Sequence, residues 1–78
     1  MIFLIQYNRK RREMVRFERF EDSERQIAYD IKFDLELRLN RESNRDEVVI
    51  LEASSEEAVR KTHRRYFETL EQLVTAPV

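Results

Sequence analysis

Any chemistry in this chain is most readily sought around its single histidine. His63 is followed by Arg65 and Tyr66, which places an imidazole, a guanidinium and a phenol within four positions. An imidazole titrates near neutral pH and can act as a general base or as a pH-sensitive contact. On a helix, however, His63 lies on the apolar face near Val59 and Phe67, where half-buried imidazoles usually bond a backbone carbonyl or a carboxylate. We therefore treat His63, Arg65 and Tyr66 as candidate functional residues and assign no catalytic residue.

Two basic groups could instead contact phosphate. Residues 1–20 carry six basic and two acidic side chains, a net of +4, whereas residues 21–58 carry five basic and twelve acidic ones, a net of −7. Such a polarised charge is typical of a surface that binds nucleic acid, with nearby aromatic rings available for stacking. The candidate nucleic-acid-binding residues are Arg9, Lys10, Arg11, Arg12, Arg60, Lys61, Arg64 and Arg65.

Other observations weaken the nucleic-acid hypothesis. The whole chain has a net charge of −1, whereas dedicated nucleic-acid-binding domains are usually basic. In addition, Glu56 and Glu57 each precede a basic residue by four positions, the spacing of ordinary ion pairs on a helix. A third interpretation is that the basic hairpin of one copy meets the acidic half of another copy.

The composition excludes several kinds of site. The chain has no glycine, so it cannot contain a Gly-rich phosphate loop of the dinucleotide-binding or ATPase type. It has no cysteine, which rules out disulfides and Cys-ligated zinc or iron–sulfur centres. One histidine and scattered carboxylates show no metal-ligand spacing, and no nucleophilic triad can be assembled. We expect no metal and no cofactor.

Length and hydropathy predict one small domain. The chain has 78 residues, of which 41% are hydrophobic and 40% charged, so we treat residues 1–78 as a single domain. The apolar run at residues 2–5 is too short for a transmembrane span or a signal peptide. We expect no membrane association and a cytoplasmic location.

Three segments read as strands. Residues 2–7 are apolar on both faces, which predicts a central strand. A hairpin at residues 8–12 follows, with Asn8 expected in the turn conformation that glycine usually supplies. The more polar return strand covers residues 13–20, and a β-branched run at 47–53 forms the third strand. In the return strand, strict alternation should point Val15, Phe17 and Arg19 to one face and Met14, Arg16, Glu18 and Phe20 to the other.

Two segments read as helices. The first is expected at residues 23–41, with Ser23 in a capping box. Apolar residues alternate with polar ones across residues 26–39, so a strand remains the alternative there, but helix propensity favours the helix. The second helix is expected from a Ser54 cap to about Val74.

The predicted fold is α+β with element order ββαβα. We expect a three-stranded, mainly antiparallel sheet of order 2-1-3, with both helices on one face. The other face would then expose apolar strands, and Tyr29, Phe33 and Leu37 would form a second apolar stripe on the first helix. Monomers rarely expose such patches, which favours a homodimer, although a curved sheet wrapped by its helices is the alternative.

The segment from Glu47 to Phe67 resembles part of a group of short uncharacterised bacterial proteins. The resemblance is carried by Val48-Val49-Ile50-Leu51-Glu52-Ala53, Ser55-Glu56-Glu57 and Thr62-His63-Arg64-Arg65-Tyr66-Phe67. The group has no assigned activity, so the resemblance implies the ββαβα outline and adds no chemistry.

The sequence thus leaves three functional hypotheses. The leading one is a small homo-oligomeric interaction or regulatory protein without its own chemistry, which contacts a second copy or another protein. The second is a nucleic-acid-binding module that uses the two basic groups. The third is a small enzyme that uses His63.

Overall fold

The computed structural model describes residues 1–67, and the elements follow the predicted ββαβα order. They are β1 (Ile2–Asn8), β2 (Glu13–Phe20), the 3-10 turn η1 (Asp22–Glu24), α1 (Arg25–Arg41), β3 (Glu47–Glu52), α2 (Glu56–Thr62) and the 3-10 turn η2 (Arg64–Tyr66). The sheet has the order β2-β1-β3, and β1 pairs antiparallel with both neighbours. The predicted strands, strand order and α+β class are therefore confirmed.

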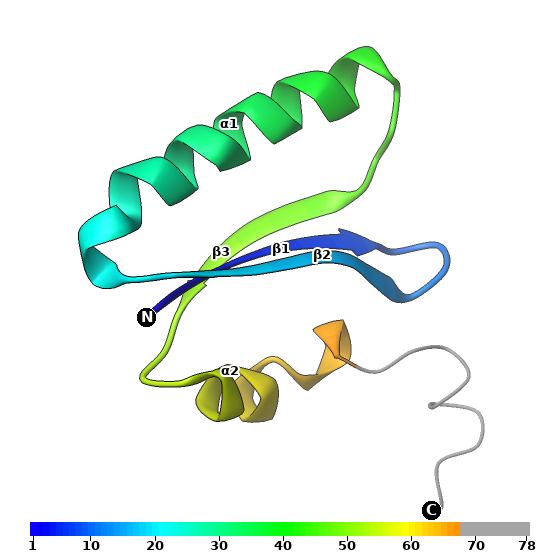
Figure 1. The fold of residues 1–78 in the computed structure, drawn as a ribbon. Helices are drawn as coiled ribbons and strands as arrows, with labels where there is room; N and C mark the ends of the chain where they lie inside the picture. The colour runs from blue at the N-terminus through cyan, green and yellow to red at the C-terminus, as the bar shows by residue number, and fades with distance from the viewer. Residues whose placement is uncertain (68–78) are drawn as a thin grey trace, which may run out of the picture.

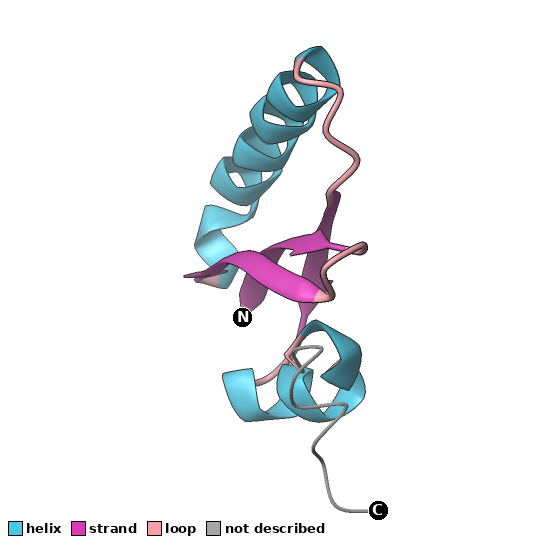
Figure 2. Cartoon of the chain, turned by 90° about the vertical axis from the view of Figure 1, so that its right-hand side faces the viewer, coloured by secondary structure: helices cyan, strands magenta, loops and turns pink. Residues whose placement is uncertain are grey.

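The two helices lie on opposite faces of the sheet, not on one face as the sequence suggested (Figures 1 and 2). On one face, the Tyr66 ring contacts Tyr7 of β1, with 5.2 Å between ring centroids. On the other face, α1 packs over β3 and β1. Six consecutive residues of β1, Ile2 to Tyr7, are buried as a result. The expected open sheet face is wrong, because each helix covers one of the two apolar faces of β1.

Residues 25–41 form a helix, so the strand alternative is ruled out. Ala28, Leu35 and Leu39 are buried beneath α1, as expected for a helix stripe facing a sheet. Leu37 and the other members of the second stripe remain in solvent. Their exposed fractions are 47% for Tyr29, 62% for Phe33 and 47% for Leu37.

The second helix is shorter than predicted. Its N-cap is Ser55 rather than Ser54, and the Ser55 hydroxyl accepts a hydrogen bond from the Ala58 N–H at 3.1 Å. The helix stops at Thr62, because His63 has φ −127° and ψ 49° and a single 3-10 turn follows. The predicted continuation to Val74 extends past residue 67, outside the described residues.

A bulge in β2 changes the predicted alternation of its side chains. Gln6 pairs with Arg16 but Tyr7 pairs with Met14, so Val15 is an extra residue. Met14 consequently joins Phe17 on the Tyr66 side of the sheet, and Val15 is 54% exposed. Strict alternation had put Met14 on the opposite face.

Within residues 1–67, two non-glycine residues adopt the left-handed conformation. Arg12 ends the hairpin turn with φ 52°, while Asn8 contributes its side chain, whose Oδ1 accepts from the Arg11 N–H at 2.8 Å. The turn role predicted for the Asn8 backbone therefore belongs to Arg12. After α1, Ser43 has φ 55°. The N–H groups of Ser43 and Asn44 bond the carbonyls of Asn40 and Leu39, which closes the helix in a Schellman motif.

None of the helices within residues 1–67 combines the length and apolar character needed to cross a lipid bilayer.

Candidate functional site

A carboxylate at the start of β3 contacts groups from two other parts of the chain, η2 and the hairpin. Glu47 accepts hydrogen bonds from Arg65 at 3.1 and 3.2 Å and from the Tyr66 hydroxyl at 3.2 Å. Arg9 of the hairpin approaches the same carboxylate, with 3.8 Å between Nε and Oε2. The Glu47 side chain is only 20% exposed, so these charged contacts are screened less than surface ion pairs. The cluster therefore ties η2 and the hairpin to β3.

Tyr66 lies at the centre of this cluster. Its ring stands edge-on to Tyr7, and the Arg65 guanidinium lies over it, 4.2 Å from the ring centroid. The Arg65 Nη2 group also donates to the Tyr66 hydroxyl at 2.6 Å. Burial raises the pKa of Tyr66 above its ordinary value of 10.0, and the negative charge of Glu47 raises it further. The phenol consequently stays neutral and donates its proton to Glu47.

His63 lies beside this cluster rather than in it. The imidazole is half-buried, with its ring 6.3 Å from the Tyr66 ring. Within residues 1–67, no hydrogen bond involves its side chain. General-base catalysis needs a second positioned group within hydrogen-bond reach of the base or of the substrate. Of the three candidates, the structure thus brings Arg65 and Tyr66 together and supplies Glu47, not His63, as their partner.

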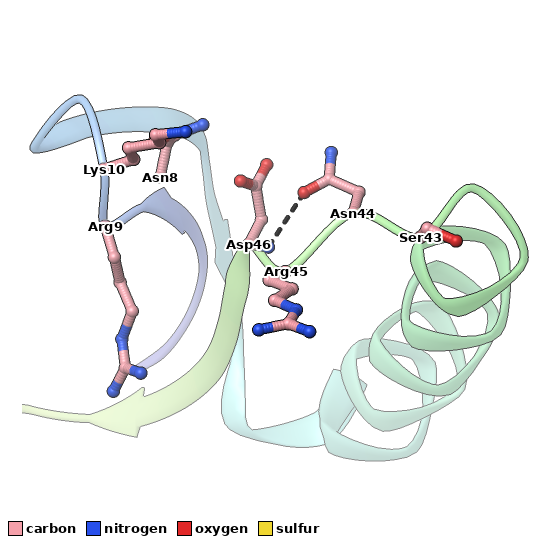
Figure 3. Close-up of a pocket in the computed structure, with 7 residues that line it drawn as sticks. All are labelled: Asn8, Arg9, Lys10, Ser43, Asn44, Arg45 and Asp46. Atoms are coloured by element: carbon pink, nitrogen blue, oxygen red, sulfur yellow. Dashed lines mark hydrogen bonds between the residues drawn. The ribbon is translucent and has the colours of Figure 1, made fainter.

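The hairpin and the loop before β3 enclose a hollow of about 660 Å³ at the same end of the sheet (Figure 3). Asn8, Arg9 and Lys10 line it from the hairpin, and residues 43–46 line it from the loop. Arg45 and Lys10 are exposed, and neither has a carboxylate within ion-pair distance among the described residues. Asp46 is engaged, because its carboxylate accepts from Gln6 Nε2 at 2.7 Å.

The remaining basic candidates are scattered. Arg60 pairs with Glu56 at 2.9 Å and covers the Phe67 ring, while Lys61 pairs with Glu57 at 3.2 Å. Arg11 pairs with Glu13 at 3.4 Å on the hairpin. Arg12 is exposed in the turn, and Arg64 is exposed in η2. The structure thus joins Arg9, Lys10 and Arg65 at one end of the sheet and leaves Arg60 and Lys61 on α2.

Sequence reasoning missed Glu47 and Arg45. The signal was present in the predicted topology, because antiparallel pairing of β1 with β3 places the end of β1 beside the start of β3. Glu47 stands at that start, and Arg45 lies in the loop just before it, next to the hairpin. Choosing Glu47 among sixteen acidic residues also required the location of Arg65, which depends on the break at His63.

Within the part of the chain that the structure describes, no group of three or more His, Asp or Glu side chains is placed to hold a metal ion. In comparisons with models of known protein families, with curated proteins and with solved structures, the chain gave no match. The function must therefore be inferred from the molecule itself.

Proposed function

We propose that this chain works by assembling with a second copy of itself, as a small interaction or regulatory protein. The observation that carries the proposal is the apolar stripe on α1, formed by Tyr29, Phe33 and Leu37 at intervals of one helical turn. All three side chains are about half exposed or more, and Phe33 is 62% exposed. Contiguous apolar patches on small proteins usually mark interaction surfaces. A symmetric dimer covers the patch on both copies at once.

The test is the mass in solution, measured by size exclusion with light scattering across protein concentration. We expect a dimer for the natural sequence. The Phe33→Glu variant should weaken it at least tenfold, because burial of a Phe side chain contributes about 1.5–3 kcal/mol. Val15→Glu is the matched control, since Val15 is also exposed and lies on the bulge of β2. A monomer at the highest concentration would contradict the proposal.

A second candidate function rests on the hollow at the basic end. Lys10 and Arg45 line it without a carboxylate partner among the described residues, and such cations bind phosphate oxygens readily. Here the ligand would be a nucleic acid whose backbone lies across the hairpin. Binding of a single-stranded RNA or DNA oligonucleotide, followed by fluorescence anisotropy, should weaken steeply with salt and with Lys10→Ala. Absence of binding at low salt would remove this candidate.

A further inference from the structure

The ladder between β1 and β3 fixes the direction of every backbone group in β3. The Ala53 N–H bonds the Met1 carbonyl at 3.1 Å, and the two residues continue the register in which Ile2 faces Glu52. Hydrogen-bonded pairs alternate with non-bonded pairs along an antiparallel ladder. Leu51 and, further along, residues 49 and 47 therefore also direct their backbone groups toward β1.

The backbone N–H and C=O groups of Val48, Ile50 and Glu52 consequently point away from β1, in the plane of the sheet, toward its free edge. β3 is an edge strand, and no backbone group within residues 1–67 bonds to its outer side. A row of unpaired donors and acceptors at this spacing is matched only by another extended strand.

The two edges of the sheet differ in how they are protected. β2 carries a bulge at Val15 and alternating charges, including an ion pair between Arg16 and Glu18. Both features discourage pairing with another chain. β3 has neither in its centre, because Val48-Val49-Ile50-Leu51 is an uninterrupted apolar run and all four residues are half-buried. Among the residues that the structure describes, the β3 edge is therefore the one that is open to a further strand.

We propose that β3 pairs antiparallel with β3 of a second copy, on a two-fold axis at Ile50, to form one six-stranded sheet. This inference rests on the self-assembly proposed above and specifies its surface. Outward groups must face outward groups, and only an axis at Ile50 pairs all three outward residues of β3 with one another. Val48 then faces Glu52 of the second copy, and Glu47 faces Ala53 of the second copy. No two carboxylates stand opposite each other.

The position of α1 supports the same pairing independently. Ile31, Arg38 and Arg41 line a hollow together with Arg16 of β2, so that flank of α1 faces β2. Arg25 lies on the opposite flank, where it forms an ion pair with Glu52 of β3. The exposed stripe continues around the helix from the Arg25 flank, away from β2.

A two-fold axis through the sheet keeps both copies of α1 on one face, with their stripes turned toward the seam. Because α1 lies over β3 and β1, its axis runs about one strand spacing, ~4.8 Å, from the two-fold axis. Two copies would then be about 10 Å apart, which is the packing distance of neighbouring helices. The same partner would thus pair with the edge of β3 and cover the apolar stripe of α1.

The first test uses single cysteines, since the chain has none of its own. In the proposed pairing, the two Ile50 Cα atoms would be about 5.5 Å apart, within the range of a disulfide. The two Val48 Cα atoms would be separated by about 13 Å along the strands. Under mild oxidation, Ile50→Cys should form the disulfide-linked dimer at least tenfold faster than Val48→Cys.

The second test removes one outward N–H group. Glu52→Pro and Glu52→Ala both lose the ion pair with Arg25, but only proline removes the N–H that would bond Val48 of the second copy. Glu52 ends β3, and its N–H does not serve β1, so the inner ladder is preserved. The proline variant should raise the dimer dissociation constant at least tenfold above that of the alanine variant.

The outcomes separate this inference from the proposed function. A monomeric natural protein would overturn both. A dimeric natural protein that shows equal cross-linking of the two cysteine variants and equal dissociation constants for the two Glu52 variants would overturn the β3 pairing alone. The assembly would then rest on the α1 stripe without a shared sheet.

Discussion

Glu47 is the residue on which three separate elements depend. Its carboxylate accepts from Arg65 and Tyr66 and lies near Arg9, while its side chain is largely buried. Removing one partner of a part-buried charged network leaves the others unsatisfied, which costs more than losing a surface ion pair.

Glu47→Ala should therefore lower the free energy of unfolding by about 1.5–3 kcal/mol, the usual contribution of hydrogen bonds to charged groups. Glu13→Ala is the control, because Glu13 pairs with Arg11 on the exposed hairpin and should cost about 0–1 kcal/mol. Urea denaturation of the two variants measures the difference. Equal losses would mean that the Glu47 cluster does not stabilise the fold.

Tyr66 gives the cluster a distinct alkaline signature. Its pKa is raised in the folded protein by burial and then by Glu47, so the folded state favours the neutral phenol. This contribution to stability is complete below pH 10.0, the ordinary pKa, and it is lost as the pH rises through the folded pKa. Thermal unfolding between pH 8 and 11 should show a smaller alkaline loss for Tyr66→Phe. Equal alkaline losses for Tyr66→Phe and for the natural protein would contradict this expectation.

At the scale of elements, the motif that closes the C-terminal end of α1 contains a residue that is poorly suited to its backbone conformation. Ser43 takes φ 55° in the Schellman motif, a position where glycine is usual. Relief of left-handed strain, about 1–2 kcal/mol, should exceed the entropy cost of glycine, about 0.5–1 kcal/mol.

Ser43→Gly should accordingly stabilise the protein by about 0.5–1 kcal/mol. Ser54→Gly serves as the control, because Ser54 lies in the loop before α2 and does not have positive φ. The Ser54→Gly variant relieves no strain and adds only the entropy cost of glycine, so it should be slightly less stable than the natural protein. Differential scanning calorimetry, at a protein concentration below the dimer dissociation constant, compares the stabilities of the two variants. A Ser43→Gly variant less stable than the natural protein would contradict the strain argument.

The elements differ in how far the sequence predicted them. The strands and the helix at residues 25–41 followed from local hydropathy and helix propensity, which act within a few positions. The cap predicted at Ser23 is wrong, because Ser23 lies inside η1 and Glu24 is the N-cap of α1, without a side-chain hydrogen bond. The bulge at Val15 and the break at His63 did not follow from local hydropathy or propensity, because both depend on tertiary packing: Met14 contributes to the Tyr66 cluster, and Tyr66 must reach Glu47. Local patterns do not contain those distances.

The placement of the helices needed information at a longer range. An apolar run on both faces of β1 indicated that both faces are covered, yet placing α1 and α2 together contradicted that pattern. The buried stretch from Ile2 to Tyr7 would have predicted helices on opposite faces. For the candidate site, the sequence identified Arg9, Lys10, Arg65 and Tyr66 as candidates. It did not identify Glu47, the carboxylate that accepts hydrogen bonds from Arg65 and Tyr66.

At the scale of the whole molecule, assembly should be visible in the melting temperature. If only folded chains form the dimer, the apparent melting temperature rises with protein concentration. Apolar and backbone contacts are little affected by salt, whereas a contact between the basic hairpin and the acidic half of a second copy would be screened. Scanning fluorimetry across concentration and salt should show the first dependence and only a weak second one. A melting temperature independent of concentration would contradict assembly.

The central position of β1 also shapes how the chain acquires its structure. The β1–β2 hairpin closes through a short local turn, but the other side of β1 pairs with β3, and Tyr7 meets Glu47 forty residues further along. Long-range pairing must overcome the entropy of closing that loop before its contacts form. We therefore expect the docking of β3 to limit the folding rate, and until it occurs one edge of the most apolar strand is unpaired. The strand that supplies the core is thus also the strand that has an unpaired edge while the chain folds.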